Sequence, residues 1–211
     1  MSAGSAHWNA VYSEKGETQT SWFRPHLDES LRLIDSLALP PSASLLDVGG
    51  GRATLVDDLL ARAFDDVSVL DLSDTALAEV RQRLGAHGAG VHWIVGDVTK
   101  LELPAARYAL WHDRAVFHFL TERVEQAAYV ATATRAVKSG GYAVIGTFAE
   151  DGPTQCSGLP IARYTAEALA ALFAPAFEKI SSSRDVHHTP AGNQQAFTYV
   201  VLRRRDDGAS T

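Results

Sequence analysis

Four aspartates each stand at or just after the end of a short apolar run, and this arrangement limits the fold more than any other feature. They are Asp47, Asp71, Asp97 and Asp113. Helical patterns separate the apolar runs, and strands that alternate with helices predict a mainly parallel sheet covered on both faces. Because parallel strands end at one edge of a sheet, we expect the four carboxylates at the edge where such folds bind ligands.

The element boundaries follow from hydrophobic periodicity and from turn and capping signals. Strands are predicted at 44–48, 67–71, 91–95, 108–112, 142–148, 177–186 and 197–203. Helices are predicted at 27–37, 53–64, from Ser73 or Asp74 to 84, at 121–137 and at 165–173. The chain is therefore expected to form an α/β fold with helices on both faces of the sheet.

Length and composition favour one domain and exclude several classes of partner. The 211 residues divide into an N-terminal lid and helix (1–41), a core (42–203) and a tail (204–211). The formal net charge of −6 gives no reason to expect nucleic acid or an anionic membrane as a partner. The single cysteine, Cys156, favours a cytoplasmic location, and no secretory signal or membrane-spanning run is expected.

A glycine cluster, Gly49 to Gly51, lies between the first strand and the following helix. Glycines there let a ligand approach the backbone closely. The dinucleotide fingerprint fails, because Thr54 stands where its third glycine would be. Carboxylates at successive strand ends suit a polar, hydroxyl-rich ligand better than a pyrophosphate. We therefore predict a neutral or cationic nucleoside, with an NAD-linked oxidoreductase as the alternative.

Five motifs in order resemble those of the class I S-adenosylmethionine-dependent methyltransferases. They are Leu45–Gly51, Val69–Asp71, Val95–Val98, Tyr108–Leu120 and Ser139–Gly141. The resemblance spans roughly residues 42 to 203. It implies a Rossmann-like, doubly wound sheet of seven strands with the seventh antiparallel, S-adenosylmethionine as cofactor, and S-adenosylhomocysteine as product.

The resemblance also implies a role for each residue of the cofactor site. Gly49 and Gly51 would lie against the methionine part, and Asp71 would accept hydrogen bonds from the ribose hydroxyls. Asp97 and Val98 would contact adenine, Leu72 would pack on its face, and Asp47 would organise the glycine loop and the aminoacyl end. Asp113 would lie at the cofactor as well. Two positions depart from the family pattern, with Ala53 in place of a glycine and Ala109 in place of an aspartate.

The acceptor site is predicted just after the fourth strand. A base is needed only if the acceptor carries a proton that must leave. Asp113 and His118 are the predicted catalytic residues. Asp113 follows the predicted fourth strand, where the family that the sequence resembles places its acceptor-facing residues, and the imidazole of His118 could take a proton at neutral pH. Arg114 and His118 are predicted to contact the substrate. The alternative is that Asp113 pairs with Arg114 and His118 only packs on aromatic rings.

The aromatic segment from Trp8 to Phe23 resembles the lid that covers the cofactor in this family. Tyr12 and Trp22 are predicted to contact the substrate and to shield the sulfonium by cation–π interaction. Arg24 and His26 would add substrate contacts. The alternative is that the aromatic side chains only anchor the segment. The stretch from Trp8 to Pro25 also resembles bacterial relatives of small protein-lysine methyltransferases.

The histidines and Cys156 match no zinc signature, so we predict no metal site. The predicted function is methyl transfer from S-adenosylmethionine to an N, O or S nucleophile of a small molecule. The alternatives are a protein-lysine methyltransferase and a regulator that binds the cofactor without turnover.

Overall fold

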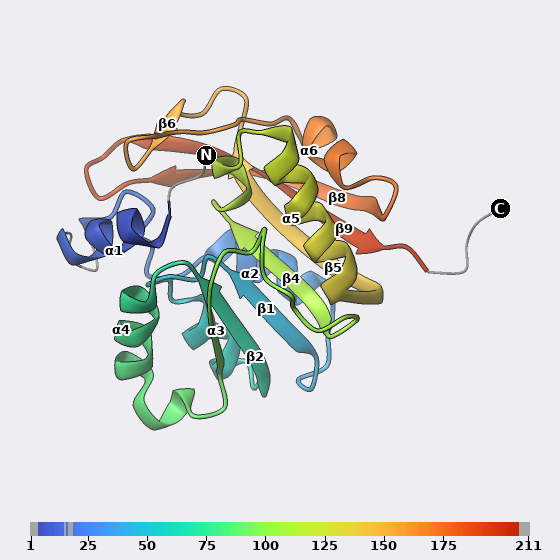
Figure 1. Cartoon of the computed structure of the whole chain (residues 1–211), viewed down its shortest axis with the longest axis horizontal. Coiled ribbons are helices and arrows are strands. Elements are labelled where there is room, and N and C mark those ends of the chain that lie inside the picture. Colours follow the sequence, from blue (N-terminus) through green and yellow to red (C-terminus); the bar gives the residue numbers. More distant parts are fainter. Residues whose placement is uncertain (1–3, 15, 17–18, 207–211) are drawn as a thin grey trace.

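The computed structural model describes residues 4–14, 16 and 19–206, and a seven-stranded sheet forms its centre (Figure 1). The strand order is β3-β2-β1-β4-β5-β9-β8; β9 runs antiparallel to both of its neighbours, and the other adjacent pairs are parallel. The strands are β1 (Ser44–Val48), β2 (Asp66–Asp71), β3 (His92–Val95), β4 (Tyr108–Arg114), β5 (Val137–Phe148), β8 (Phe177–His188) and β9 (Gln194–Arg204). This sheet confirms the predicted fold, including its antiparallel last strand.

Helices cover both faces of the sheet. On one face lie α2 (Asp28–Ser36), α3 (Leu55–Ala61) and α4 (Asp74–Leu84), and on the other lie α5 (Arg123–Ala136) and α6 (Ala166–Phe173). The N-terminal helix α1 (Ser5–Glu14) packs against α4. Shorter elements are η2 (Gly85–Gly88), η3 (Phe117–Phe119) and the hairpin of β6 (Gln155–Cys156) and β7 (Leu159–Pro160).

Successive side chains of a strand point to opposite faces of the sheet, and a hydrophobic core lies on each face. Leu45 of β1 and Leu110 of β4 point to the core under α2–α4, whereas Leu46 and Trp111 point to the core under α5 and α6. Every residue of β1 is buried, as expected for a central parallel strand covered on both faces. This alternation also decides where the polar side chains at the strand ends point.

The element boundaries differ from prediction in a few places. The helix predicted at 53–64 is shorter (Leu55–Ala61), and Ala63, just after it, has a positive φ of 62°. The first α4 turn is capped by Ser73, whose Oγ accepts from the amide of Ala76 at 3.1 Å. Helix α1 and the β6–β7 hairpin are not predicted from the sequence. Residues 15, 17 and 18 of the predicted lid and residues 207–211 of the predicted tail lie outside the described residues.

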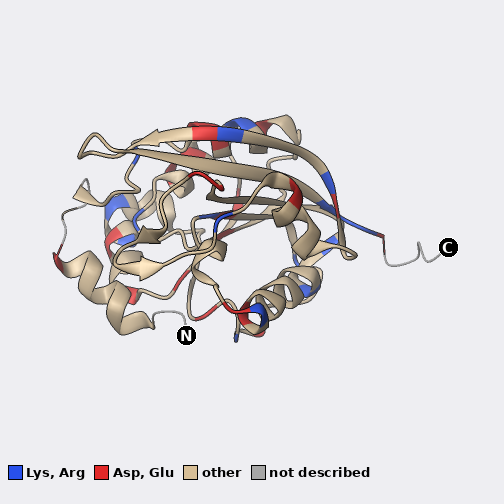
Figure 2. Ribbon diagram, turned by 90° about the horizontal axis from the view of Figure 1, so that it is seen from above, with Lys and Arg blue, Asp and Glu red and all other residues tan. Residues whose placement is uncertain are grey.

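The surface carries both signs of charge. In the view of Figure 2, Lys and Arg are interspersed with Asp and Glu along the outer helices and strands. Within the part of the chain that the structure describes, no helix combines the length and apolar character needed to cross a bilayer.

Candidate active site

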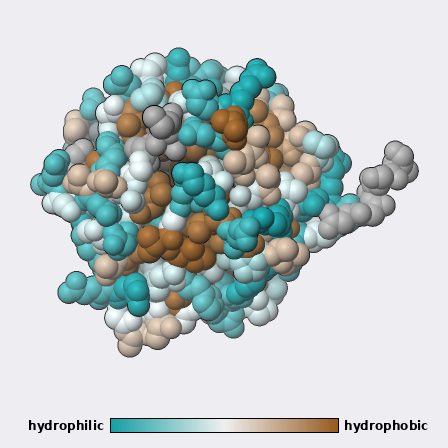
Figure 3. All heavy atoms as spheres, in the orientation of Figure 1, coloured by the Kyte–Doolittle hydropathy of each residue, from teal (hydrophilic) through white to brown (hydrophobic). Residues whose placement is uncertain are grey.

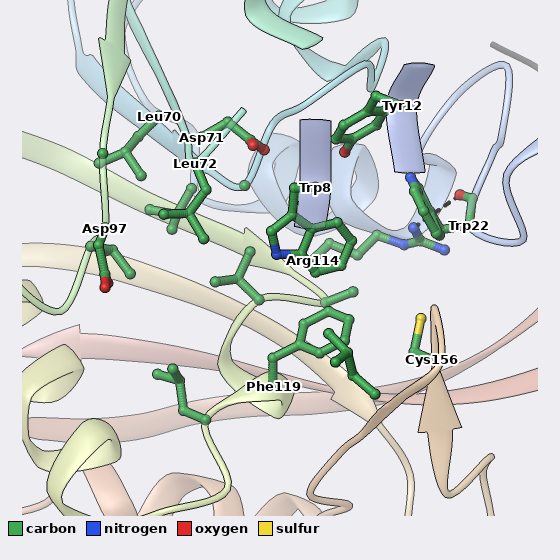
Figure 4. Close-up of a pocket in the computed structure, with 18 of the residues that line it drawn as sticks. Trp8, Tyr12, Trp22, Leu70, Asp71, Leu72, Asp97, Arg114, Phe119 and Cys156 are labelled. Carbon is green, nitrogen blue, oxygen red and sulfur yellow. Dashed lines mark hydrogen bonds between the residues drawn. The ribbon is translucent and has the colours of Figure 1, made fainter. Parts of the chain in front are cut away.

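A cavity opens at the carboxyl ends of β1, β2 and β4, below α1 (Figure 4). The cavity and its mouth together enclose about 930 Å³, which includes space open to solvent. In Figure 3, apolar side chains gather in the middle of the face on which Figure 1 shows α4 and α5. The wall consists of Trp8, Tyr12, Trp22, Val48, Gly49, Leu70, Asp71, Leu72, Gly96, Asp97, Val98, Arg114, Ala115, Val116, Phe119, Leu120, Phe148, Cys156, Leu159 and Phe197.

The glycine loop forms part of the cavity floor. Gly49 and Gly51 have φ values of 70° and 44°, where residues with a side chain are strained. A Cβ at Gly49 would also overlap Val116, and one at Gly51 would overlap the hydroxyl of Tyr12. The amide of Gly49 donates to the carbonyl of Leu70 at 2.7 Å, which ties the loop to β2. The backbone is therefore bare on the side that faces the cavity.

Asp71, at the end of β2, is 7% exposed and lines the cavity. Its carboxylate accepts from the amide of Ser73 at 2.8 Å and from the amides of Gly51 and Leu72. Burial raises the pKa of Asp71 to about 6, because these hydrogen bonds only partly offset the loss of solvent. The carboxylate is ionised at neutral pH and suited to accept further hydrogen bonds.

Asp97 and Val98 follow β3 and line the same end of the cavity, together with Leu72. Burial alone would raise the pKa of Asp97, but hydrogen bonds from Lys100 and Thr99 together hold that pKa below its ordinary value. The Asp97–Lys100 ion pair is 2.8 Å long and lies at the surface. The structure thus brings the residues predicted for ribose and adenine to one end of the cavity.

Asp47 is buried and does not line this cavity; its side chain holds His112. The register of β1 and β4 places Asp47 opposite His112, so both point to the face covered by α2. The Oδ1 atom of Asp47 lies 2.7 Å from Nδ1 of His112, and Nε2 of His112 lies 2.9 Å from Oγ of Ser30. Ser30 is fully buried. This chain of hydrogen bonds connects the end of β1 to α2.

The predicted lid residues Tyr12 and Trp22 do line the cavity, and Trp8 joins them. Trp8 packs edge-on against Trp22 and Phe119, with centroid distances of 6.2 and 5.0 Å. Tyr12 is buried, which raises its pKa well above the ordinary value, and the charge of Asp71 raises it further. The three rings close the cavity from above (Figure 4).

Polar contacts anchor both ends of this lid. In α1, Asn9 accepts from the hydroxyl of Ser73 at 2.6 Å and donates to Asp74 at 3.0 Å. Beyond Trp22, Arg24 pairs with Asp185 of β8 at 2.9 Å and donates to the Val186 carbonyl. The lid therefore spans from the helix that follows Asp71 to the far edge of the sheet.

Asp113 lies outside the cavity and within β4, one residue before its end, whereas the sequence placed it just after the strand. Alternation along β4 directs its side chain toward α5, where it is fully buried. Its carboxylate accepts from the amides of Val116 and Phe117 at 2.8 and 3.0 Å and from the hydroxyl of Tyr129 at 2.5 Å. Burial raises the pKa of Asp113 to about 6. Asp113 therefore holds the loop after β4 and does not reach the cavity, where it was predicted to act as a catalytic residue.

His118 is also fully buried, behind the wall formed by Phe119 and Phe148. Its Nδ1 accepts from the amide of Phe148 at 3.4 Å, and its Nε2 has no hydrogen-bond partner. Burial, together with the smaller effect of the charge of Arg114, lowers the pKa of His118 to about 3. The imidazole is neutral at physiological pH and is not part of the cavity wall.

Arg114 enters the cavity, because alternation along β4 directs it away from Asp113. The two side chains do not form the local ion pair considered from the sequence. The guanidinium donates to the carbonyl of Trp22 at 3.3 Å and stacks on the ring of Phe197 at 4.5 Å (Figure 4). It interacts with no carboxylate among the residues that the structure describes.

A second, smaller cavity of about 510 Å³ lies beside the glycine loop. Arg114, Tyr12, Trp22 and Gly49 line both cavities, so the two meet at these residues. The remaining wall is more polar and consists of Thr20, Phe23, Arg24, Leu27, Asp47, Gly50, Arg52, Ala53 and His112. His26, predicted near the substrate, instead pairs with Asp58 at 3.0 Å on the surface.

Sequence reasoning missed the aromatic wall opposite the lid. Phe148 of β5 and Phe197 of β9 face each other in the sheet register and pack edge to face at 4.8 Å. Phe119 and Leu159 complete this wall. The only signal in the sequence was that Phe148 ends a predicted strand. Phe197 follows Phe148 by 49 residues and reaches it only through the pairing of β5 with β9, which the sequence does not show.

The chemistry of these residues fits the adenosine and the sulfonium of S-adenosylmethionine. Bare glycine backbone, two carboxylates at the strand ends and aromatic rings suit hydroxyl donors, an amino donor and a cation. Among the described residues, no group of three or more His, Cys, Asp or Glu side chains is arranged to hold a metal ion.

Comparison with known proteins identifies the central part of the chain. The family model of the methyltransferase domain matches residues 45–141, which run from β1 into the first part of β5. Two curated relatives are the eEF1A lysine and N-terminal methyltransferase of Mus musculus and the EEF1A lysine methyltransferase 2 of Homo sapiens, each 24% identical. The matches cover 53% and 66% of this chain but 16% and 65% of those proteins, so the chain spans less than two thirds of either.

Solved structures share the fold over nearly the whole chain. One was studied for the conversion of a disulfide bond into a thioacetal group during echinomycin biosynthesis; it has a TM-score of 0.80 and 19% identity, covering 97% of this chain and 93% of that one. Another is the Burkholderia thailandensis 1,6-didemethyltoxoflavin-N1-methyltransferase with S-adenosylhomocysteine bound. Its TM-score is 0.70 at 22% identity, over 96% of this chain and 84% of that one.

Proposed function

The chain carries a class I S-adenosylmethionine-dependent methyltransferase domain, and we propose that it transfers the methyl group of this cofactor to an N, O or S atom of a small molecule. The observation that carries the proposal is the division of one cavity into two chemically different ends. Asp71 and Asp97 lie at one end, and Phe148, Phe197 and Leu159 lie at the other. A polar nucleoside suits the first end and an apolar acceptor the second.

At the polar end, the residues expected to hold the cofactor are those that the five motifs predict. Asp71 would accept from the ribose, Asp97 and Val98 would border the adenine, and Gly49 and Gly51 would leave room for the methionine part. When bound, the cofactor supplies a methyl group on a positively charged sulfur. Tyr12 and Trp22 line the cavity, and their rings would face that charge.

The chain would accelerate the reaction mainly by holding the acceptor in line and by excluding water. The lid rings and the aromatic wall surround the junction of the two cavities with apolar side chains. Fixing two reactants in such an enclosure can account for a large part of the rate of a bimolecular transfer. This explanation needs no acid or base on the chain itself.

A lysine side chain of a partner protein is the second candidate acceptor, because the two relatives named above are lysine methyltransferases. The charge in the cavity argues against it. Arg114 has no carboxylate beside it, and two positive charges in an enclosed, apolar site repel each other strongly. A lysine ammonium would therefore enter at a cost that a neutral or anionic small molecule avoids.

The test is a binding measurement followed by a turnover measurement. Calorimetry should show S-adenosylhomocysteine and S-adenosylmethionine binding and no NAD binding. Cell extract, separated by size, should then support release of S-adenosylhomocysteine from the fraction of small molecules. Turnover only with the protein fraction would favour the lysine acceptor, and binding with no turnover in either fraction would favour the non-catalytic regulator.

A further inference from the structure

Arg114 is a partly buried cation at the junction of the two cavities, and no carboxylate of the described residues pairs with it. Its Nη2 atom is buried and has no hydrogen-bond partner. The guanidinium donates to the carbonyl of Trp22 through Nη1 and lies against the hydroxyl of Tyr199, and both of these partners are neutral. The ring of Phe197 covers one face of the guanidinium. Taking a charge out of water is costly unless an opposite charge accompanies it. The position therefore suits an anion that arrives with a ligand.

The groups that pack around Arg114 do not supply that anion. His118 of η3 and His187 of β8 are neutral, because burial, and after it the charge of Arg114, lowers the pKa of both. The hydroxyl of Tyr199 in β9 lies against the guanidinium but stays protonated, because burial raises its pKa. Asp185 of β8, the nearby carboxylate, is paired with Arg24 at 2.9 Å.

Neither the carboxylates of the cavity wall nor its tyrosine can remove a proton from the acceptor. Its titratable side chains are Tyr12, Asp71, Asp97, Arg114 and Cys156. Asp71 and Asp97 lie at the nucleoside end, and Tyr12 holds its proton far above neutral pH. An acceptor that ionises by itself beside a cation would need none of these groups.

We propose that the acceptor is a thiol on an apolar frame, bound as its thiolate with the sulfur beside Arg114. This inference rests on the proposed methyltransferase function. A thiolate fits better than an oxygen anion because sulfur is a weak hydrogen-bond acceptor, and the apolar end offers few donors besides Arg114. A neighbouring arginine lowers the pKa of a thiol, so the anion forms near neutral pH.

The transfer balances without any further reactant. The thiol proton leaves to solvent as the thiol binds. A lone pair of the thiolate sulfur forms the new bond to the methyl carbon, while the bond from that carbon to the sulfonium breaks and its electron pair stays on the departing sulfur. Two neutral thioethers result, the methylated acceptor and S-adenosylhomocysteine. Arg114 then again lacks a counter-ion, which favours product release.

Three acceptors with one carbon frame test the inference: phenylmethanethiol, benzyl alcohol and benzylamine. The wild-type chain should methylate the thiol at least tenfold faster than either of the others at pH 7.5. The pH profile of kcat for the thiol should show a pKa at least about one unit below that of the free thiol. The variant Arg114→Met should lose most of its kcat at pH 7.5, and its profile should return to the pKa of the free thiol.

A matched substitution of an exposed arginine, Arg81→Met, should leave both the rate and the profile unchanged. Binding of S-adenosylhomocysteine to Arg114→Met must stay within about threefold of wild type, which shows that the variant is folded and that Arg114 does not hold the cofactor carboxylate. If Arg114→Met binds S-adenosylhomocysteine more weakly while its KM for the acceptor is unchanged, the inference is overturned. Preferred methylation of benzylamine, loss of thiol methylation in a folded His118→Phe variant, or no thiol methylation at all would overturn it too. Failure of the wild-type chain to bind S-adenosylhomocysteine would instead refute the proposed function.

Discussion

Replacement of Asp71 by asparagine tests the nucleoside end of the cavity most directly. An ionised carboxylate can accept about four hydrogen bonds, and the amides of Gly51, Leu72 and Ser73 already use three of them. About one position is left for a ribose hydroxyl, and a hydrogen bond to a charged group contributes roughly 2 kcal/mol. We therefore expect Asp71→Asn to weaken S-adenosylhomocysteine binding about 30-fold in calorimetry.

The pH dependence of the same binding gives an independent measurement. The pKa of Asp71 is about 6, because burial and the nearby charge of Asp47 disfavour its ionised form. Since the ionised form binds hydroxyls better, affinity is full above pH 6 and is lost as the pH falls through that value. Between pH 7.5 and pH 5 the wild type should lose about tenfold in affinity, whereas Asp71→Asn should change little.

The exposed Asp65, on the loop before β2, provides the control. Asp65→Asn should bind as the wild type does at every pH. If Asp71→Asn binds within about threefold of wild type at pH 7.5, or if wild-type affinity is flat from pH 7.5 to 5, the carboxylate does not contact the ribose and the reasoning is refuted.

Three further substitutions probe the glycine loop, the loop after β4 and the lid. Gly49→Ala should lower the stability to urea by at least about 1 kcal/mol and abolish measurable cofactor binding, because the new Cβ meets Val116 at a positive φ. Tyr129→Phe should lower the unfolding free energy by about 3 kcal/mol, because it leaves the buried Asp113 without its hydroxyl donor; a loss under 1 kcal/mol would mean that water takes that place. Asn9→Ala should weaken S-adenosylhomocysteine binding several-fold by loosening α1 from α4, and chymotrypsin should cleave faster after Trp8 and Tyr12 of α1; an unchanged affinity and an unchanged cleavage rate would show that the lid does not contribute to binding.

The fold was predictable because local signals and the fold agree almost everywhere. The run Ser44–Val48 is apolar on both faces, as a central parallel strand must be, and it ends at the glycine cluster. Helix α1 escaped prediction because its apolar residues do not recur along one face, so Trp8 and Tyr12 could be assigned to a lid but not to a helix.

The site was predictable only as far as strand ends determine it. Asp71 and Asp97 line the cavity because Asp71 ends β2 and Asp97 lies two residues after β3. At the end of β4, a one-residue difference decides between the cavity and the core: Arg114 enters the cavity and Asp113 faces α5. The sequence alone could not show whether Asp113 or Arg114 would face the acceptor. The answer depends on which face of β4 borders the cavity, and the neighbouring strands determine that.

The same alternation explains why Asp47 does not reach the cofactor cavity and still belongs to the site. Asp47, His112 and Ser30 form a buried chain of hydrogen bonds, and the hydroxyl of Tyr199 lies against both Ser30 and Arg114. One polar network thus runs from the end of β1, beside the glycine loop, to the unpaired cation at the acceptor end. Because each buried polar group in it needs its partner, we expect a change at either end to disturb the other end. We therefore expect the aspartate of the first motif to influence the position of Arg114 as well as the loop that it precedes.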